Sequence, residues 1–499
     1  MSSTTRRRGT VPGWIEDRNG ASPAANKWAV FVVIALGIFM ATLDSSIVNI
    51  SLPTIARHFQ VGLSGTVEWV IIAYLVVVSA TLLTIGRLAD MVGRKPIWAT
   101  GLVIFTIGSA LCGASTSLPM LVAFRAFQGL GGSLLMAISP AMLTSAFPAS
   151  ERGRALGLNA VMVSLGVSAG PTLGGILTQD LTWRAIFYVN VPIGVVGLIA
   201  ALKILRREPN RGRGRFDPFG AGLLAVGLAA LTLGLSFGQE WGWTSPRSLA
   251  SIFVGIAGLV ATVLFELRTS DPILDFSLFR DRVFSSASFS QILSFLALFA
   301  VSFLLPFYLE ELRGYSTIRA GLLLTPLPLS IAVVAPISGT LADRVGTRWL
   351  ASIGLAVACG GLVLISFLTA STPMWQLVGT LMFTGVGQGL FQSPNNSAML
   401  GAAPRGRQGV ASGILATGRT VGQSISVALA GAIFAAAGAA AAGAQLSARA
   451  AAATAAGPSV ADLRLTFQHG FRLSFIVCAA IAAVGIFTSL VRGSELVGA

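Results

Sequence analysis

The sequence predicts an all-α polytopic membrane protein, and three observations lead to that fold class. The 499 residues are 54% hydrophobic and only 11% charged, and their mean hydropathy is +0.79. A water-soluble domain carries about 25% charged residues, so this chain lacks the charge that a soluble surface needs. Its apolar residues are grouped into runs of roughly 20, the length that crosses a bilayer as a helix. A soluble enzyme, a nucleic-acid-binding protein and a disordered chain are poor fits.

Fourteen apolar runs are each long enough to form a transmembrane helix. They cover about residues 28–52, 66–85, 97–115, 118–142, 155–178, 185–203, 218–238, 249–266, 284–309, 318–339, 349–369, 374–399, 409–438 and 470–491. Of the 34 Lys and Arg residues, 24 fall in the N-terminal tail, in alternate loops and at the C-terminus, against eight in the other loops. Because basic residues concentrate on the cytoplasmic side, we expect both termini in the cytoplasm and the basic loops beside anionic lipid.

Two loops repeat one pattern. The loop after the second run reads G-R-L-A-D-M-V-G-R-K over residues 86–95, and the loop after the tenth reads G-T-L-A-D-R-V-G-T-R over 339–348. Two glycines and an aspartate recur at the same offsets, at Gly86, Asp90 and Gly93 and at Gly339, Asp343 and Gly346. Two copies of one loop predict two homologous six-helix bundles, which leaves the seventh and eighth helices as an inserted pair.

The repeat predicts the order of domains along the chain. A cytoplasmic tail over 1–27 precedes the first bundle over 28–203, a basic linker over 204–217, the inserted helices over 218–266, a second linker over 267–283, the second bundle over 284–491 and a tail over 492–499. The composition of the Ala-rich stretch 439–469 inside the second bundle suits a fraying helix, and we expect an outer loop there that acts as a solvated spacer.

The loop pattern resembles the signature loop of the major facilitator superfamily. Twelve helices plus a central pair are similar to its fourteen-span drug:proton antiporter branch. The resemblance implies that the loop latches the two halves together when the transporter faces outward, whereas a topology anchor alone is the alternative. Gly86 and Gly93 would allow close helix approach and a tight turn, and Arg94 and Lys95 would hold the loop on the inner face. Thr347 replaces the arginine in the second copy, so we expect a weaker second latch there.

Asp44, in the first run, is the only acidic residue well inside any of the fourteen. A charge at that depth costs several kcal/mol unless it is neutralised, paired or hydrated. Residues 43–53 resemble the first-helix motif of the fourteen-span branch. That likeness implies proton coupling or cation binding at Asp44 and places Asn49 in the same site. A purely structural buried acid is the alternative.

Arg125, in the fourth run, is a cation in the middle of a predicted helix. Gln128 shares its helical face three residues later, and the two match the family's Arg-x-x-Gln-Gly-x-Gly element. A buried arginine needs a partner, and no other deep carboxylate is present, so we predict that Arg125 pairs with Asp44 directly or through water. Bonding to backbone carbonyls alone is the alternative.

The fifth run carries glycines at every fourth position, Gly166, Gly170 and Gly174. Such a stripe predicts close helix packing, and Pro171 adds a point at which the helix can bend. Together with Gly175 these residues give G-P-x-x-G-G, which resembles the superfamily's antiporter motif. That motif is typical of exporters rather than importers.

Further polar residues fall inside two late runs. Gln388, Gln392 and Asn395 share one face of the twelfth run and are predicted to line a polar cavity, with interhelical hydrogen bonding as the alternative. Arg419 and Gln423 form a polar pair in the thirteenth run. The acid that some family members carry in this helix is missing from the sequence.

The leading functional interpretation is a proton-coupled antiporter. It would export hydrophobic, often cationic small molecules across the cytoplasmic membrane by alternating access, as a monomer. The sequence has no Walker loop and no metal-ligand spacing among its three cysteines and two histidines. We therefore expect no enzyme, no metal and no cofactor, with the proton gradient as energy source. The alternatives are a lipid or lipid-conjugate translocase on the same fold and a non-transporting membrane scaffold or sensor.

Overall fold

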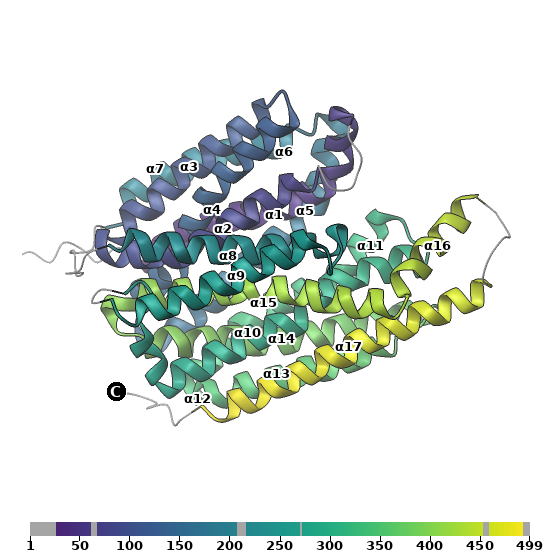
Figure 1. Ribbon diagram of the computed structural model, residues 1–499. Helices are drawn as coiled ribbons and strands as arrows, with labels where there is room; N and C mark the ends of the chain where they lie inside the picture. The colour runs from purple at the N-terminus through teal and green to yellow at the C-terminus, as the bar shows by residue number, and fades with distance from the viewer. Residues whose placement is uncertain (1–25, 61–66, 207–215, 270–271, 453–458, 493–499) are drawn as a thin grey trace, which may run out of the picture.

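A computed structural model describes residues 26–60, 67–206, 216–269, 272–452 and 459–492. Within these ranges the chain is helical and contains no strand. The long helices run side by side in one elongated bundle, with α16 at one end of it (Figure 1). Thirteen helices of this part of the chain are long and apolar enough to cross a membrane. The remaining predicted span, 374–399, forms a helix of sufficient length that is less apolar.

The first half of the chain forms the helices that we call the N-terminal bundle. They are α1 (Lys27–Phe59), α2 (Trp69–Val92), α3 (Arg94–Ala114), α4 (Leu118–Ala146), the short η1 (Ala149–Glu151), α5 (Arg152–Asp180), α6 (Ala185–Tyr188) and α7 (Asn190–Ile204). Their buried side chains build apolar cores from residues between 30 and 205, including Trp98 and Phe105, which are fully buried.

An inserted pair and a second set of helices follow. The pair is α8 (Pro218–Trp241) and α9 (Pro246–Glu266), and η2 (Phe276–Arg280) leads out of it. The set that we call the C-terminal bundle comprises α10 (Arg282–Phe307), which ends in the π-helical turn η3 (Tyr308–Leu312), α11 (Thr317–Leu324), α12 (Pro326–Val345), α13 (Thr347–Ser366), α14 (Met374–Ala402), η4 (Arg405–Arg407), α15 (Gln408–Ala436), α16 (Ala439–Ala452) and α17 (Val460–Leu490). Residues between 297 and 482 form its main core.

Two predicted elements differ in the structure. The span predicted over 318–339 is divided at Thr325, directly before Pro326, because proline has no N–H to continue the hydrogen-bond ladder. The stretch 439–469, expected to be an outer loop with the composition of a fraying helix, contains α16 and the start of α17. Alanine is the strongest helix former, and the small side chains of Ala439 and Ala442 are buried in the main core of the C-terminal bundle.

The two bundles meet along two lines of contact. One joins α2 to α15 and the other joins α5 to α12, and we call them the α2–α15 seam and the α5–α12 seam. We call the end of the molecule that carries Asp90 and Asp343 the latch end. The first residue of α1 lies there, because Lys27 Nζ is 2.6 Å from Glu151 Oε2 in η1. The last turn of α17 lies there too, because Arg492 donates to Thr347.

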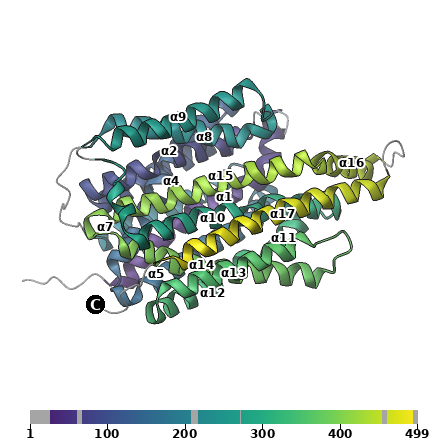
Figure 2. The ribbon, with the colours of Figure 1, turned by 60° about the horizontal axis from the view of Figure 1, so that its bottom comes forward.

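The inserted pair covers one of these seams. Helix α8 packs against both α2 and α15, and α9 packs on α8 (Figure 2). The hydroxyls of Ser79 in α2 and Thr232 in α8 are 3.0 Å apart, and the rings of Trp69 and Phe237 lie 4.9 Å apart between centroids. Within the described ranges, no helix from outside the two bundles lies across the α5–α12 seam.

Candidate functional site

The N-terminal bundle holds a buried ion pair between Asp44 of α1 and Arg125 of α4. Arg125 Nη1 donates to Asp44 Oδ2 at 2.6 Å, and 0% and 1% of the two side chains are exposed. The other carboxylate oxygen, Oδ1, accepts from Gln128 Nε2 at 2.9 Å and from Asn190 Nδ2 at 3.0 Å. A buried ion pair needs such extra hydrogen bonds to offset the cost of removing both charges from water. The structure therefore brings Asp44, Arg125 and Gln128 into direct contact.

The surroundings of Arg125 explain the glycines that follow it. Arg125 Nε donates to the Val70 carbonyl at 2.9 Å, and its guanidinium lies 4.5 Å from the centroid of the Tyr74 ring. A side chain at Gly129 or Gly132 would overlap Tyr74. These glycines thus let α2 pack close enough to α4 for the tyrosine to cover the arginine.

Asn190, at the start of α7, is a member of the cluster that sequence reasoning missed. Its signal was an amide in a short apolar segment, residues 183–194. Asn49, in contrast, has an exposed side chain in α1 and is not among the three hydrogen-bond donors to Asp44. The structure places the amide of Asn190, and not that of Asn49, on the carboxylate.

The first signature loop joins α2 to the first turn of α15. Asp90 Oδ1 accepts from the backbone N–H of Gly409 at 2.9 Å, and Oδ2 accepts from that of Val410 at 3.0 Å. The first N–H groups of a helix have no partner inside the helix and attract negative charge. A Cβ added at Gly86 would overlap the Gly409 carbonyl, so glycine is required for this approach. Asp90 therefore caps a helix of the opposite bundle.

The second copy makes the same contact in the opposite direction. Asp343 Oδ1 accepts from the Gly153 N–H at 2.9 Å, and Oδ2 accepts from the Arg154 N–H at 3.1 Å, both in the first turn of α5. Gly339 lies against the Gly153 carbonyl as Gly86 lies against that of Gly409. Each aspartate thus caps a helix across a seam.

Both loops turn at a glycine in the left-handed region, Gly93 with φ +103° and Gly346 with φ +88°. An L-residue with a Cβ rarely adopts these angles. The glycines therefore set the direction in which the next helix begins.

The basic residues of the first loop bond inside the protein. Arg94 is buried, donates to the Ala141 carbonyl at 3.1 Å and lies 3.7 Å from Asp90. Lys95 donates to the Leu202 carbonyl at 2.9 Å near the end of α7. At the second loop Thr347 stands in place of the arginine, and it accepts a hydrogen bond from buried Arg492 at 3.1 Å.

The glycine stripe of α5 packs on α1 next to Asp44. A Cβ at Gly166 would lie 3.0 Å from the Leu43 nitrogen, and one at Gly170 would overlap Ser46. Ser46 also donates to the Val167 carbonyl at 2.8 Å. Gly174 is buried, whereas Gly175 has no atom within 4 Å of an added Cβ and takes no part in the contact. The side chain of Pro171 lies outside the described part of the structure.

The polar residues of α14 and α15 occupy different environments. Asn395 is fully buried and donates to the Ala287 carbonyl at 3.0 Å and to Gln291 Oε1 at 3.1 Å. It therefore makes interhelical hydrogen bonds, which were the alternative to a place on a cavity wall. The other four polar residues predicted in these helices have half-buried side chains: Gln388, Gln392, Arg419 and Gln423. Arg419 lies over the Phe295 ring, 5.4 Å from its centroid.

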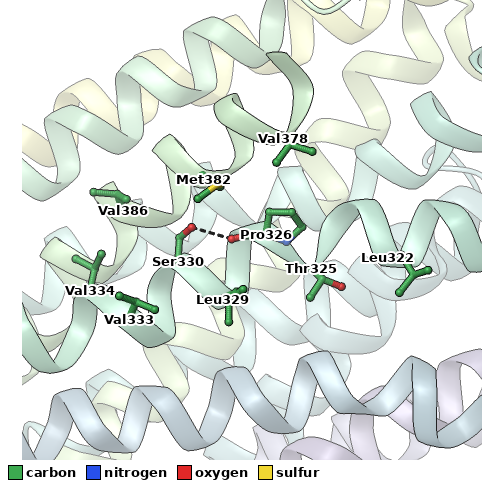
Figure 3. Close-up of a pocket in the computed structure, with 10 residues that line it drawn as sticks. All are labelled: Leu322, Thr325, Pro326, Leu329, Ser330, Val333, Val334, Val378, Met382 and Val386. Atoms are coloured by element: carbon green, nitrogen blue, oxygen red, sulfur yellow. Dashed lines mark hydrogen bonds between the residues drawn. The ribbon is translucent and has the colours of Figure 1, made fainter. Parts of the chain in front are cut away.

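An apolar pocket of about 500 Å³ lies between α11, α12 and α14. Figure 3 shows side chains such as Leu329, Val333 and Met382 around it, and the Ser330 hydroxyl donates to the Pro326 carbonyl. None of the predicted site residues lines this pocket. Its walls favour an apolar ligand or an acyl chain and offer no charged group.

The chain is similar in sequence and in fold to known proteins. A family model described as Major Facilitator Superfamily matches residues 34–427. Over 409 residues the chain is 37% identical to the riboflavin transporter RibZ of Clostridioides difficile, covering 81% of this chain and 87% of the relative. It is 35% identical over 409 residues to the multidrug resistance protein Stp of Mycobacterium tuberculosis, covering 81% and 76%. The crystal structure of the human organic anion transporter MFSD10 shares its fold, with a TM-score of 0.66 at 15% identity over 93% of this chain and 99% of that one.

Proposed function

We propose that the chain, which belongs to the Major Facilitator Superfamily and is a membrane transporter rather than an enzyme, works as an antiporter. The transport is coupled to protons. The protein exports hydrophobic small molecules from the cytoplasm, and Asp44 carries the proton. The observation that supports this proposal is the Asp44–Arg125 pair, a carboxylate held by three N–H donors in the middle of a membrane bundle.

Protonation of Asp44 would remove the counter-ion of Arg125. Breaking a buried ion pair by neutralising one partner costs about 3–5 kcal/mol, which is enough to drive a rearrangement of α1 against α4. Helix α1 packs on Gly166 and Gly170 of α5, and the first turn of α5 is capped by Asp343 of the other bundle. A shift of α1 would therefore reach the second signature loop through α5.

The latch end is, in this proposal, the cytoplasmic end. Both aspartate contacts are made there, and the close glycine contacts between the bundles lie at the same end. The structure then corresponds to an outward-facing state. Both termini lie in the cytoplasm, where the basic loops contact anionic lipid headgroups.

The relatives support a small-molecule substrate without fixing its charge. They include the multidrug resistance protein Stp and the riboflavin transporter RibZ. We take small organic molecules as the shared class. The apolar pocket between α12 and α14 favours a second candidate, the transfer of amphipathic lipids, because an acyl chain fits such walls.

Replacement of Asp44 by Asn tests the proposal. In inverted vesicles energised with a proton gradient, addition of a transported drug should dissipate the gradient for the wild type and not for Asp44→Asn, while the amount of inserted protein stays unchanged. Asp44→Glu should retain part of the activity because it keeps a titratable group. Asp462→Asn, which removes an exposed carboxylate of α17, is the matched control.

Proton release at the wild-type rate by the Asp44→Asn variant would contradict the proposal. Transfer of a fluorescent lipid without drug-dependent proton release would favour the second candidate.

A further inference from the structure

Arg419 of α15 is a membrane-embedded cation whose charge the transport cycle described above does not use. It lies in the middle of a helix that crosses the membrane, and its side chain is half-buried over the Phe295 ring. Among the described residues, its guanidinium pairs with no carboxylate and donates no hydrogen bond. Asp44, the acid nearest the middle of a span, is already bound to Arg125 in the other bundle.

Such an arginine is costly to keep. A charged side chain near the centre of a bilayer is unfavourable, and charges at that depth generally face a partner or a polar pathway. Arg125 has its partner in the structure, and Arg419 does not. The missing partner is an anion.

The packing of α15 shows where that anion would bind. Gly418 and Gly422 face α10, where Ile292 and Phe295 lie, and Gly413 faces α2. Val421 packs against an apolar cluster that includes Leu224 and Leu228 of the inserted helix α8. Arg419 is two residues, or about 200°, away from Val421 on the helix.

Ala416, one turn before Arg419, packs against the main core of the N-terminal bundle, so Arg419 lies on the side of α15 that is turned toward that bundle. Gln423 lies on the same face one turn later and is also half-buried. An arginine, an amide and the Phe295 ring thus come together on one wall.

We propose that Arg419 binds the acidic group of an amphipathic substrate, a carboxylate or sulfonate on an apolar aromatic body. The planar guanidinium matches such groups with paired hydrogen bonds. Gln423 supplies an additional donor, and the apolar body lies along α10. Recognition then resides in the C-terminal bundle, apart from the proton-carrying Asp44 in the N-terminal bundle. The substrate class rests on the proposed transport function, and the binding test below does not require proton coupling.

The test compares two probes that differ only in charge, 1-pyrenebutyrate and the neutral 1-pyrenebutanol. Equilibrium binding is measured on the full-length protein in phosphatidylcholine nanodiscs, with no proton gradient. Arg419→Gln should weaken pyrenebutyrate binding by about tenfold or more and change pyrenebutanol binding by less than about twofold, because only the acid loses a charged hydrogen bond. Arg419→Lys should fall between, since it keeps the charge and loses the planar fork.

Arg472→Gln is the matched control. Arg472 also lies over a phenylalanine ring, 5.0 Å from the centroid of Phe367, but it is exposed on α17. Its loss should leave both affinities unchanged. Pyrenebutanol binding by each variant shows that the interior is still folded.

Three kinds of result would each contradict a different claim: the acidic substrate, the small-molecule substrate or the proton coupling. Equal affinity of the wild type for the two probes, or equal weakening of both by Arg419→Gln, would overturn the assignment of an acidic substrate. Displacement of pyrenebutyrate by phosphatidylglycerol in mixed nanodiscs, dependent on Arg419, would overturn the small-molecule assignment and give the site to a lipid headgroup. Arg419-dependent binding without gradient-driven transport would count against the proton-coupled function alone.

Discussion

At the scale of single residues, the Asp44 cluster depends on two amides as well as on its ion pair. Gln128 and Asn190 both donate to the same carboxylate oxygen. A hydrogen bond to a charged group contributes about 1.5–3 kcal/mol. The amides therefore help to hold the carboxylate in place beside Arg125.

Asn190→Leu tests that role. Asp44 loses one of its three donors, so its carboxylate is held less firmly beside Arg125, and the rate of drug-driven proton release should fall by about tenfold or more. The measurement is that rate in inverted vesicles. Asn49→Leu, which removes an exposed amide of the same helix as Asp44, should leave the rate unchanged. A slower rate for Asn49→Leu and an unchanged rate for Asn190→Leu would show that the family resemblance, and not the geometry, identified the right amide.

The sequence predicted the ion pair because deep charges are rare and must find each other. Asp44 and Arg125 met both conditions. Burying an uncharged amide such as Asn190 in a membrane helix costs less free energy, so its presence there does not by itself indicate a partner. Helical periodicity gives the face on which a residue lies but not the rotation of the neighbouring helices. For that reason Asn395 and the half-buried Gln392 shared a predicted face, and only the packing of α10 showed that Asn395 is a buried bridge.

At the scale of helices, the two signature loops work through backbone contact. The aspartate can reach the first turn of the opposing helix only because a glycine lies one turn before it, at Gly86 for α15 and at Gly339 for α5. The repeat in the sequence predicted both loops. It did not predict what each aspartate binds, since the partners lie 319 and 190 residues away along the chain.

Gly86→Ala should weaken the contact between α2 and α15. The added Cβ overlaps the Gly409 backbone, and overpacking of this kind costs about 1–3 kcal/mol. The equilibrium should then move roughly 5- to 100-fold toward the state that is open at the latch end, with slower transport. The check is the labelling rate of a single engineered cysteine at the opposite end, which should fall.

Gly401→Ala is the control for that experiment. Gly401 is near the end of α14, and no atom lies within 4 Å of an added Cβ. It should label at the wild-type rate. Unchanged labelling in Gly86→Ala would mean that this contact does not bias the two states.

At the scale of the whole molecule, deletion of residues 218–266 tests how the inserted pair is joined to the rest. An even number of spans is removed, so every later loop keeps its side of the membrane, and a C-terminal reporter that is active only in the cytoplasm should stay active. Thermal stability should fall, because Leu224 and Leu228 of α8 pack in one apolar cluster with Val410 and Ile414 of α15.

Deletion of 246–266 alone is the matched control, because it removes one span and should abolish the reporter signal. A stably inserted double deletion without signal would show that the number or order of spans is wrong. The sequence predicts this topology from the lengths of its apolar runs and the charges of its loops. It was not sufficient to show that α8 lies across both bundles, because one apolar helix face does not reveal which helices it contacts.

That placement makes the two sides of the transporter unequal. Parting α2 from α15 also requires α8 to leave one of the helices that it contacts, which forfeits packing that no lipid chain fully replaces. Parting α5 from α12 breaks only the contacts between the bundles themselves. The rocking motion should therefore turn about an axis close to α8 and widen chiefly on the far side. A substrate that leaves sideways, instead of along the membrane normal, would enter the bilayer between α5 and α12. The α2–α15 seam would stay closed to it because α8 covers that side.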